Sequence, residues 1–248
     1  VTMMEERLDT SRRSVFMAGV HDGVPIALGY FVVAFTLGIL AKTAGLTPWQ
    51  GFVTSAVNIA SAGEYAGFTV IAAQAPYLEI AVLTLVANAR YFLMAAALTQ
   101  RFAPETSLLH RLAVSFGVTD EIFGVTVARG GALNPYYNYG AMAISVPAWA
   151  AGTSAGILAG GILPAAVVSA LSVALYGMFV WVVLPAAKRS RPIGGMVLAS
   201  CVLSLAATYA PVTSELSGGT RTILLTLLIA GVGAALFPIH EEQEGDHD

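Results

Sequence analysis

The chain has 248 residues, of which 56% are hydrophobic and 11% charged, and its mean hydropathy is +0.74. A soluble domain carries about 25% charged residues because its surface faces water, so this chain is expected to lie mostly in lipid. The net charge of -3, without a basic stretch interleaved with aromatic residues, argues against a nucleic-acid partner. A single cysteine excludes an internal disulfide and a multi-cysteine metal site, and we expect neither a metal nor a cofactor.

Six uninterrupted apolar stretches are long enough to cross a membrane as helices, which takes about 20 residues each. A polar N-terminal segment (1–15) and an acidic tail (241–248) flank a single transmembrane domain over 16–240. The chain is therefore predicted to be an all-α polytopic membrane protein. The six predicted spans are 23–44, 77–100, 136–160, 163–187, 193–212 and 221–239.

Two further apolar stretches are interrupted by small residues around acids. The first, 49–73, is interrupted around Glu64, and the second, 108–129, around Asp120 and Glu121. Unwound backbone survives at membrane depth only where protein or a watery cavity satisfies its amides, so both stretches are predicted to be broken or re-entrant. An inverted repeat would be compatible with this order, as in other transporters. The interruptions are expected at 61–67 and 117–124.

Basic residues favour one orientation in the membrane. Arg7, Arg12 and Arg13 predict a cytoplasmic N-terminus by the positive-inside rule. If both broken stretches re-enter, only Lys42 and Arg221 lie outside and both termini are cytoplasmic. The basic residues that then also lie inside are Arg101, Arg111, Arg129, Lys188, Arg189 and Arg191. Eight full crossings are the alternative, which keeps the termini inside but weakens the charge bias. The predicted location is a bacterial inner membrane.

Ionisable groups at membrane depth cost about 3 kcal/mol or more, so each needs a partner or a purpose. Arg90 lies well inside an apolar stretch, and Asp120 and Glu121 are its natural partners. Such a pair either ties two helices together, clamps a substrate carboxylate or acts as a gate. Asn88 and Arg90 face opposite ways on a regular helix, so we expect Arg90 to face a cavity and Asn88 to cross-link to a neighbouring helix.

The sequence leaves the roles of two other acids open. Asp22 lies beside His21 near a membrane interface, where it is either a polar cap or a proton carrier. Glu64 lies beside Gly63, where it binds a proton, grips an ammonium group, or is a structural acid bonded to unwound backbone. No phosphate-binding glycine loop, metal-binding histidine pair or serine elbow occurs, so the chain is not expected to be an enzyme.

Four short motifs occur in order along the chain: Pro-Ile-Ala-Leu-Gly-Tyr at 25–30, the small-residue break at 61–65, Asn-Ala-Arg-Tyr-Phe-Leu-Met at 88–94 and Thr-Asp-Glu-Ile-Phe at 119–123. With these motifs the chain resembles, over about 19–238, the azaleucine-resistance (AzlC-type) family of branched-chain amino acid permeases. The family usually has Gln-Phe where this chain has Glu64-Tyr65, and His where it has Tyr91. The carboxylate adds a proton-binding group or a negative charge.

The resemblance implies export of leucine, isoleucine and valine, coupled to a proton or another ion, with a small AzlD-type membrane subunit as obligate partner. A channel or exporter for another small, cationic metabolite is the alternative within transport. A non-transporting scaffold is the alternative of a different class, and charges inside the membrane argue against it. The candidate substrate-binding residues are Arg90, Asp120, Glu121, Glu64, Tyr65, Asn88, Gly63 and Tyr30, and the candidate proton-coupling residues are Glu64, Asp120, Glu121 and Asp22.

Overall fold

The computed structural model describes residues 2–129, 131–164 and 190–237, and isolated positions between 166 and 188. The regular structure of these residues is helical, apart from one isolated β-bridge between Phe102 and Leu133. Four described helices, α1, α8, α10 and α12, are long and apolar enough to cross a membrane, and a bent pair, α4 with α5, makes a fifth span. The prediction of an all-α membrane protein is confirmed. The predicted span at 163–187 and the acidic tail lie largely or wholly outside the described residues.

Helix α1 (Thr2–Thr43) includes the predicted span at 23–44 but begins far earlier, and Pro25 lies inside it. Pro25 does not break α1. Proline removes one backbone donor and crowds the preceding turn, a cost that packing along a long helix can offset. Here that packing comes from α8 (Pro135–Ala159), which matches the span predicted at 136–160.

Glycines let α1 and α8 approach closely along most of their length. A Cβ at Gly156 would overlap the carbonyl oxygen of Phe35, and one at Gly140 would overlap that of Phe16. A helix face of small residues such as Gly152 and Gly156 could also serve as a surface for another subunit. Instead, α1 of the same chain covers this surface, because glycine allows helix backbones to meet in the absence of a hydrophobic driving force.

Replacing Gly156 by alanine is expected to lower the free energy of unfolding by about 3 kcal/mol, the upper end for an overpacked core, because the clash is with backbone. Thermal unfolding in detergent measures the loss. Gly29→Ala is the matched control, since no atom lies within 4 Å of the added Cβ. Equal stability of both variants would contradict the close packing of α1 on α8.

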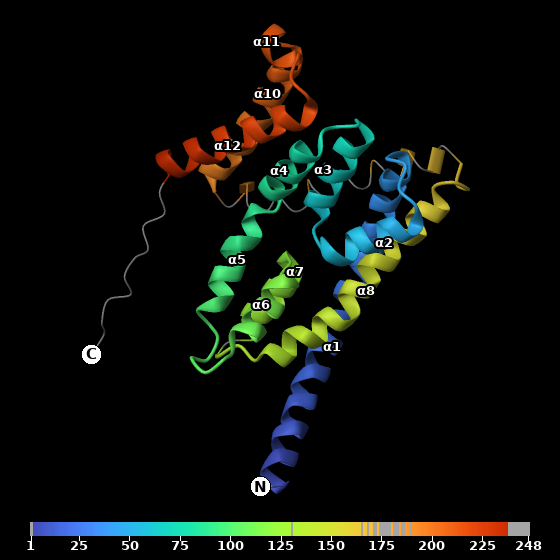
Figure 1. The fold of residues 1–248 in the computed structure, drawn as a ribbon. Helices are drawn as coiled ribbons and strands as arrows, with labels where there is room; N and C mark the ends of the chain where they lie inside the picture. The colour runs from blue at the N-terminus through green and yellow to red at the C-terminus, as the bar shows by residue number, and fades with distance from the viewer. Residues whose placement is uncertain are drawn as a thin grey trace.

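The first broken stretch forms helices α2 (Pro48–Val57) and α3 (Ser61–Ala72), as Figure 1 shows. The break lies at 58–60 rather than at the predicted 61–67, which is helical. Thr47 and Gln50 form a capping box that sets the start of α2. Small residues in 61–67 serve packing rather than unwinding, because Gly63 lies directly against Asn88.

The second broken stretch forms α6 (Leu108–Phe116) and α7 (Asp120–Ala128), with the break at 117–119. Only the first part of the predicted interruption, 117–124, is unwound. The Thr119 side chain accepts a hydrogen bond from the backbone of Ile122 and thereby caps α7. Asp120 and Glu121 consequently occupy the first turn of α7, where the helix dipole favours negative charge.

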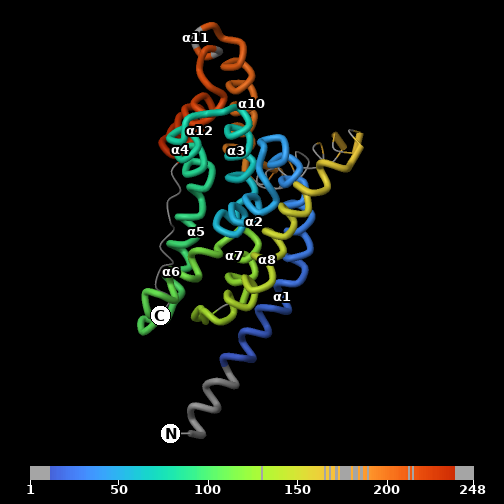
Figure 2. The backbone as a smooth tube through the Cα atoms, turned by 45° about the vertical axis from the view of Figure 1, so that its right-hand side comes forward, coloured from blue at the N-terminus to red at the C-terminus, as the bar shows by residue number. Residues whose placement is uncertain are grey.

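Helices α4 (Tyr77–Ala87) and α5 (Ala89–Thr99) meet at Asn88 with a bend of 45°. The span predicted as continuous over 77–100 is therefore broken as well. We call the end of the bundle where α1 finishes the upper end and the end where α5 finishes the lower end, as in Figure 1. Helices α4 and α5 together run from the upper end to the lower end (Figures 1 and 2).

Each of the other two pairs turns back to the end from which it starts. Near the start of α6, Arg111 donates to Thr99 O (3.3 Å), and Arg101, just after α5, donates to Val127 O near the end of α7 (2.9 Å). Both ends of the α6–α7 pair therefore lie at the lower end. The α2–α3 pair starts and ends at the upper end (Figures 1 and 2). The α2–α3 and α6–α7 pairs therefore enter the bundle from opposite ends, which is the arrangement expected of an inverted repeat.

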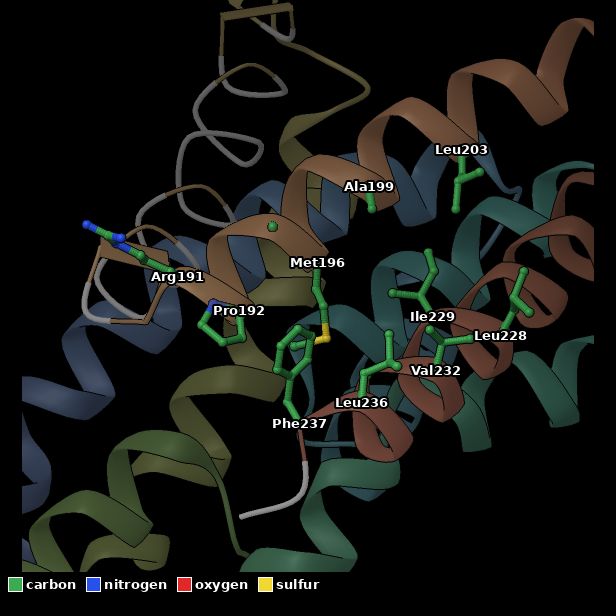
Figure 3. Close-up of a pocket in the computed structure, with 12 residues that line it drawn as sticks. Arg191, Pro192, Met196, Ala199, Leu203, Leu228, Ile229, Val232, Leu236 and Phe237 are labelled. Carbon is green, nitrogen blue, oxygen red and sulfur yellow. The ribbon is translucent and has the colours of Figure 1, made fainter.

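Helices α10 (Arg191–Tyr209), α11 (Pro211–Ser214) and α12 (Gly218–Leu236) complete the described fold. The spans predicted at 193–212 and 221–239 correspond to α10 and α12, and Pro211 follows the end of α10. Glu79 of α4 accepts from the backbone of Thr220 (3.1 Å), which ties α4 to the start of α12. An apolar groove of about 590 Å³ lies between α10 and α12 (Figure 3). No residue of the helix breaks is among the residues that line it.

We expect cysteines introduced at Ser107 and Ser190 to react only with a thiol reagent applied from the cytoplasm. Those at Thr47 and Ser217 should react only from outside, since α6–α7 and α2–α3 each return to one end. The exposed Cys201 is first replaced by serine. Ser107 precedes α6, so outside labelling there would mean that α2–α3 crosses the membrane. If Ser190 still reacts from the cytoplasm, α6–α7 crosses as well and eight crossings are correct.

Candidate functional site

The breaks of the two re-entrant pairs meet inside the bundle. Residues of both breaks line a cavity of about 40 Å³, together with residues of α1, α5 and α8. This volume holds only a few water molecules and is far below the roughly 300 Å³ of a small-molecule pocket, so the site is closed in this conformation. The lining residues are Tyr30, Val33, Ile59, Ser61, Tyr91, Thr119, Asp120, Glu121 and Trp149.

Arg90 at the start of α5 pairs with Asp120 at the start of α7, at 2.8 Å between Nη2 and Oδ2. The predicted partnership is thus confirmed, with Asp120 rather than Glu121. The Arg90 guanidinium also donates to the Tyr91 hydroxyl (3.3 Å) and lies over its ring. Its Nε is buried, with no hydrogen-bond partner among the described residues, so Arg90 retains a free donor beside the cavity.

Tyr30 connects α1 to the start of α7. Its hydroxyl lies 2.7 Å from Glu121 Oε2 and also contacts the hydroxyl of Thr119. Edge-on packing against the Trp149 ring, with centroids 5.2 Å apart, holds the phenol in place. Tyr30 and Glu121 therefore close one wall of the cavity through a side-chain hydrogen bond.

Glu64 lies behind Trp149 and is only 1% exposed. Trp149 Nε1 donates to one carboxylate oxygen (2.6 Å) and Ser55 Oγ to the other (2.8 Å), while Ser55 also contacts Thr153 at 2.7 Å. No described cation forms an ion pair with Glu64. Any negative charge there is balanced by hydrogen bonds alone.

Gly63 and Asn88 bring two helix breaks together. Asn88 Nδ2 donates to Asn58 Oδ1 (2.9 Å), so Asn88 cross-links α4–α5 to the α2–α3 break as expected. Asn88 fills the space beside Gly63, which leaves no room there for a branched side chain of a substrate. Gly63 and Asn88 therefore shape the site from behind and do not line its cavity.

Two other candidates lie elsewhere. Tyr65 lines a separate cavity of about 570 Å³ between α3, α4 and α12. Asp22 accepts from the Tyr137 hydroxyl (2.7 Å) and lies 4.0 Å from Arg129, at the lower end. Neither residue lines the closed cavity, so Asp22 stays a candidate proton carrier without a contact to the central site.

Three residues around Glu64 were not among the sequence-predicted site residues. Ser55, Trp149 and Thr153 surround Glu64, yet Ser55 and Thr153 are 98 positions apart. Trp149 was the one detectable case, because a tryptophan inside an apolar helix needs an acceptor for its N–H. Chemically, the assembled site offers one guanidinium, two acids in the cavity wall and a third, buried acid behind it.

Comparison with known proteins identifies the chain's relatives. The family model described as "AzlC protein" matches residues 25–163, more than half of the chain. An uncharacterised membrane protein of Archaeoglobus fulgidus is 31% identical over 196 residues, which cover 75% of this chain and 84% of that protein. The inner membrane protein YgaZ of Escherichia coli is 31% identical over 117 residues, covering 47% of each chain. No solved structure matches. The matched region contains the breaks of the α2–α3 and α6–α7 pairs and all residues lining the central cavity. Because the family model covers more than half of its length, the chain belongs to the AzlC family of membrane proteins.

Proposed function

We propose that this chain is a secondary active transporter that exports branched-chain amino acids across the bacterial cytoplasmic membrane. The observation that supports it most is the closed cavity where two re-entrant breaks meet beside the Arg90–Asp120 ion pair. Unwound segments with charged groups at such a junction are typical of substrate sites in carriers. Both termini are proposed to lie in the cytoplasm.

A zwitterionic amino acid matches the charges around this cavity. Arg90 has a free Nε for a carboxylate, and Asp120 and Glu121 are acceptors for an ammonium group. Substrate entry would exchange the internal ion pair for two pairs with substrate, at little electrostatic cost. The apolar wall formed by Val33, Ile59 and Trp149 suits a branched aliphatic side chain, provided that the cavity widens.

Glu64 is proposed to carry the coupling proton. A buried carboxylate without a cation is costly, and gaining or losing a proton changes the hydrogen bonds it makes with Trp149 and Ser55. Trp149 also packs on Tyr30, so protonation at Glu64 would be transmitted to the cavity wall. The small AzlD-type partner subunit is proposed on the family resemblance alone.

A cationic metabolite is the second candidate substrate. Three acids, Glu64, Asp120 and Glu121, surround the site against one described arginine, which favours a positive ligand. A scaffold without transport would have no use for these groups.

Counterflow in proteoliposomes distinguishes these functions. We expect vesicles preloaded with leucine to take up radiolabelled leucine, isoleucine and valine, and to exclude arginine and choline. The measurement is made with and without the small subunit, and we expect activity only with it. Uptake of arginine or choline alone would establish the cationic substrate, and no uptake of any solute would favour the scaffold.

A further inference from the structure

A second cavity, of about 160 Å³, lies at the lower end of the bundle, between α7, the segment before α8, and α8 itself. Arg101, Thr126, Arg129, Ala132, Tyr137 and Asn138 are among its lining residues. It shares no lining residue with the central cavity. This space holds more than a few waters but is about half of the roughly 300 Å³ of a small-molecule pocket, so an amino acid would have to widen it. Charged and amide groups border it.

Asn138 is fully buried on α8 and presents an unpaired acceptor. Its Nδ2 donates to Thr126 Oγ1 (2.9 Å), while the Thr126 hydroxyl donates to Ile122 O (2.6 Å). The threonine proton is thus already used, so its oxygen must accept, and the orientation of the Asn138 amide follows from that. Asn138 Oδ1 has no partner among the described residues. A buried acceptor without a donor is costly, and a ligand N–H group would satisfy it.

Arg129 supplies a positive charge at the same cavity. Its closest carboxylate, Asp22, is 4.0 Å away and already accepts a hydrogen bond from Tyr137 at 2.7 Å. Arg129 also lies over the Tyr137 ring, 4.3 Å from its centroid, which fixes the guanidinium at the cavity wall. A long ion pair of this kind leaves Arg129 able to bind a second carboxylate.

We propose that this cavity is an access site for a zwitterionic amino acid, with the carboxylate on Arg129 and the ammonium on Asn138 Oδ1. The inference rests on the proposed function, which makes the lower end cytoplasmic and the cavity a first stop before the central site. An ammonium donor satisfies the orphaned amide oxygen, and a carboxylate replaces the weak contact to Asp22.

Protection from thiol labelling tests occupancy without requiring transport. Ala132, an exposed lining residue, is changed to cysteine in a Cys201→Ser chain and labelled in nanodiscs with a maleimide. Leucine is expected to slow the labelling. Asn138→Leu should raise the leucine concentration for half protection about tenfold to a hundredfold, as for losing a hydrogen bond to a charged group. Ser145→Ala is the control, since Ser145 is another buried, unpaired side chain on α8.

Ligands that carry only one of the two charges distinguish the contact at Arg129 from the contact at Asn138. Isopentylamine should protect Ala132→Cys equally in the parent and in Arg129→Gln, whereas protection by 4-methylpentanoate should disappear in Arg129→Gln. Asn138→Asp keeps the acceptor and should bind isopentylamine more tightly, which tests the site even if Asn138→Leu fails to fold. Unchanged labelling with leucine in a chain that transports leucine would overturn the access site and leave the proposed function standing. Protection of Ala132→Cys by leucine in a chain that does not transport leucine would overturn the proposed function and leave leucine binding at this cavity standing.

Discussion

Glu64→Gln is expected to abolish gradient-driven accumulation of leucine while leaving exchange intact. The amide keeps the shape and an acceptor for Trp149 but cannot lose or gain a proton. A gradient of one pH unit is worth about 1.4 kcal/mol per proton, or about tenfold accumulation for one coupled proton. Proteoliposomes with an acidic lumen should therefore accumulate leucine about tenfold with the parent chain, and not at all with the variant.

Glu79→Gln is the matched control, because it makes the same chemical change at a carboxyl that caps α12. It should keep accumulation, pH dependence and exchange. If Glu64 instead grips substrate ammonium, Glu64→Gln should lower affinity and shift selectivity toward neutral amino acids. Parent behaviour in accumulation, pH dependence and selectivity would leave Glu64 with a structural role only.

Arg90→Ala is expected to reduce leucine exchange by about a hundredfold, since a hydrogen bond to a charged group contributes about 1.5–3 kcal/mol. It should also destabilise the chain by about 2 kcal/mol, less than the roughly 3–5 kcal/mol of a fully buried pair, because both side chains are about 40% exposed (41% and 43%). Counterflow and thermal unfolding measure the two effects separately.

Adding Asp120→Asn to Arg90→Ala should restore about half of the lost stability, because it removes the carboxylate left without its partner. Transport should stay low, since the cation for the substrate carboxylate is still absent. Glu105→Gln in the Arg90→Ala background is the control, as Glu105 is an exposed loop carboxylate. Additive losses in the Arg90→Ala, Asp120→Asn chain would refute an energetic coupling between the two residues.

The sequence by itself determined the class of fold and the pair of charges. Low charge content and long apolar stretches require lipid as the solvent, whatever the packing. The same requirement made Arg90 conspicuous, because a guanidinium cannot lose its charge and needs an acid. The sequence left Asp120 and Glu121 open as partners, and the structure shows the pair with Asp120 at 2.8 Å.

Only the tertiary structure decided where the helices break and which residues surround Glu64. The break lies before Ser61 rather than around Glu64, and Gly63 serves packing because it lies against Asn88, a contact that depends on another helix. Trp149, Ser55 and Thr153 approach Glu64 because α8 packs beside α2. Glycine spacing predicts that a close helix contact exists, but not which helix makes it, since backbone carbonyls are alike on every helix. The glycines of α8 could have bound another subunit, and the folded chain uses them for α1.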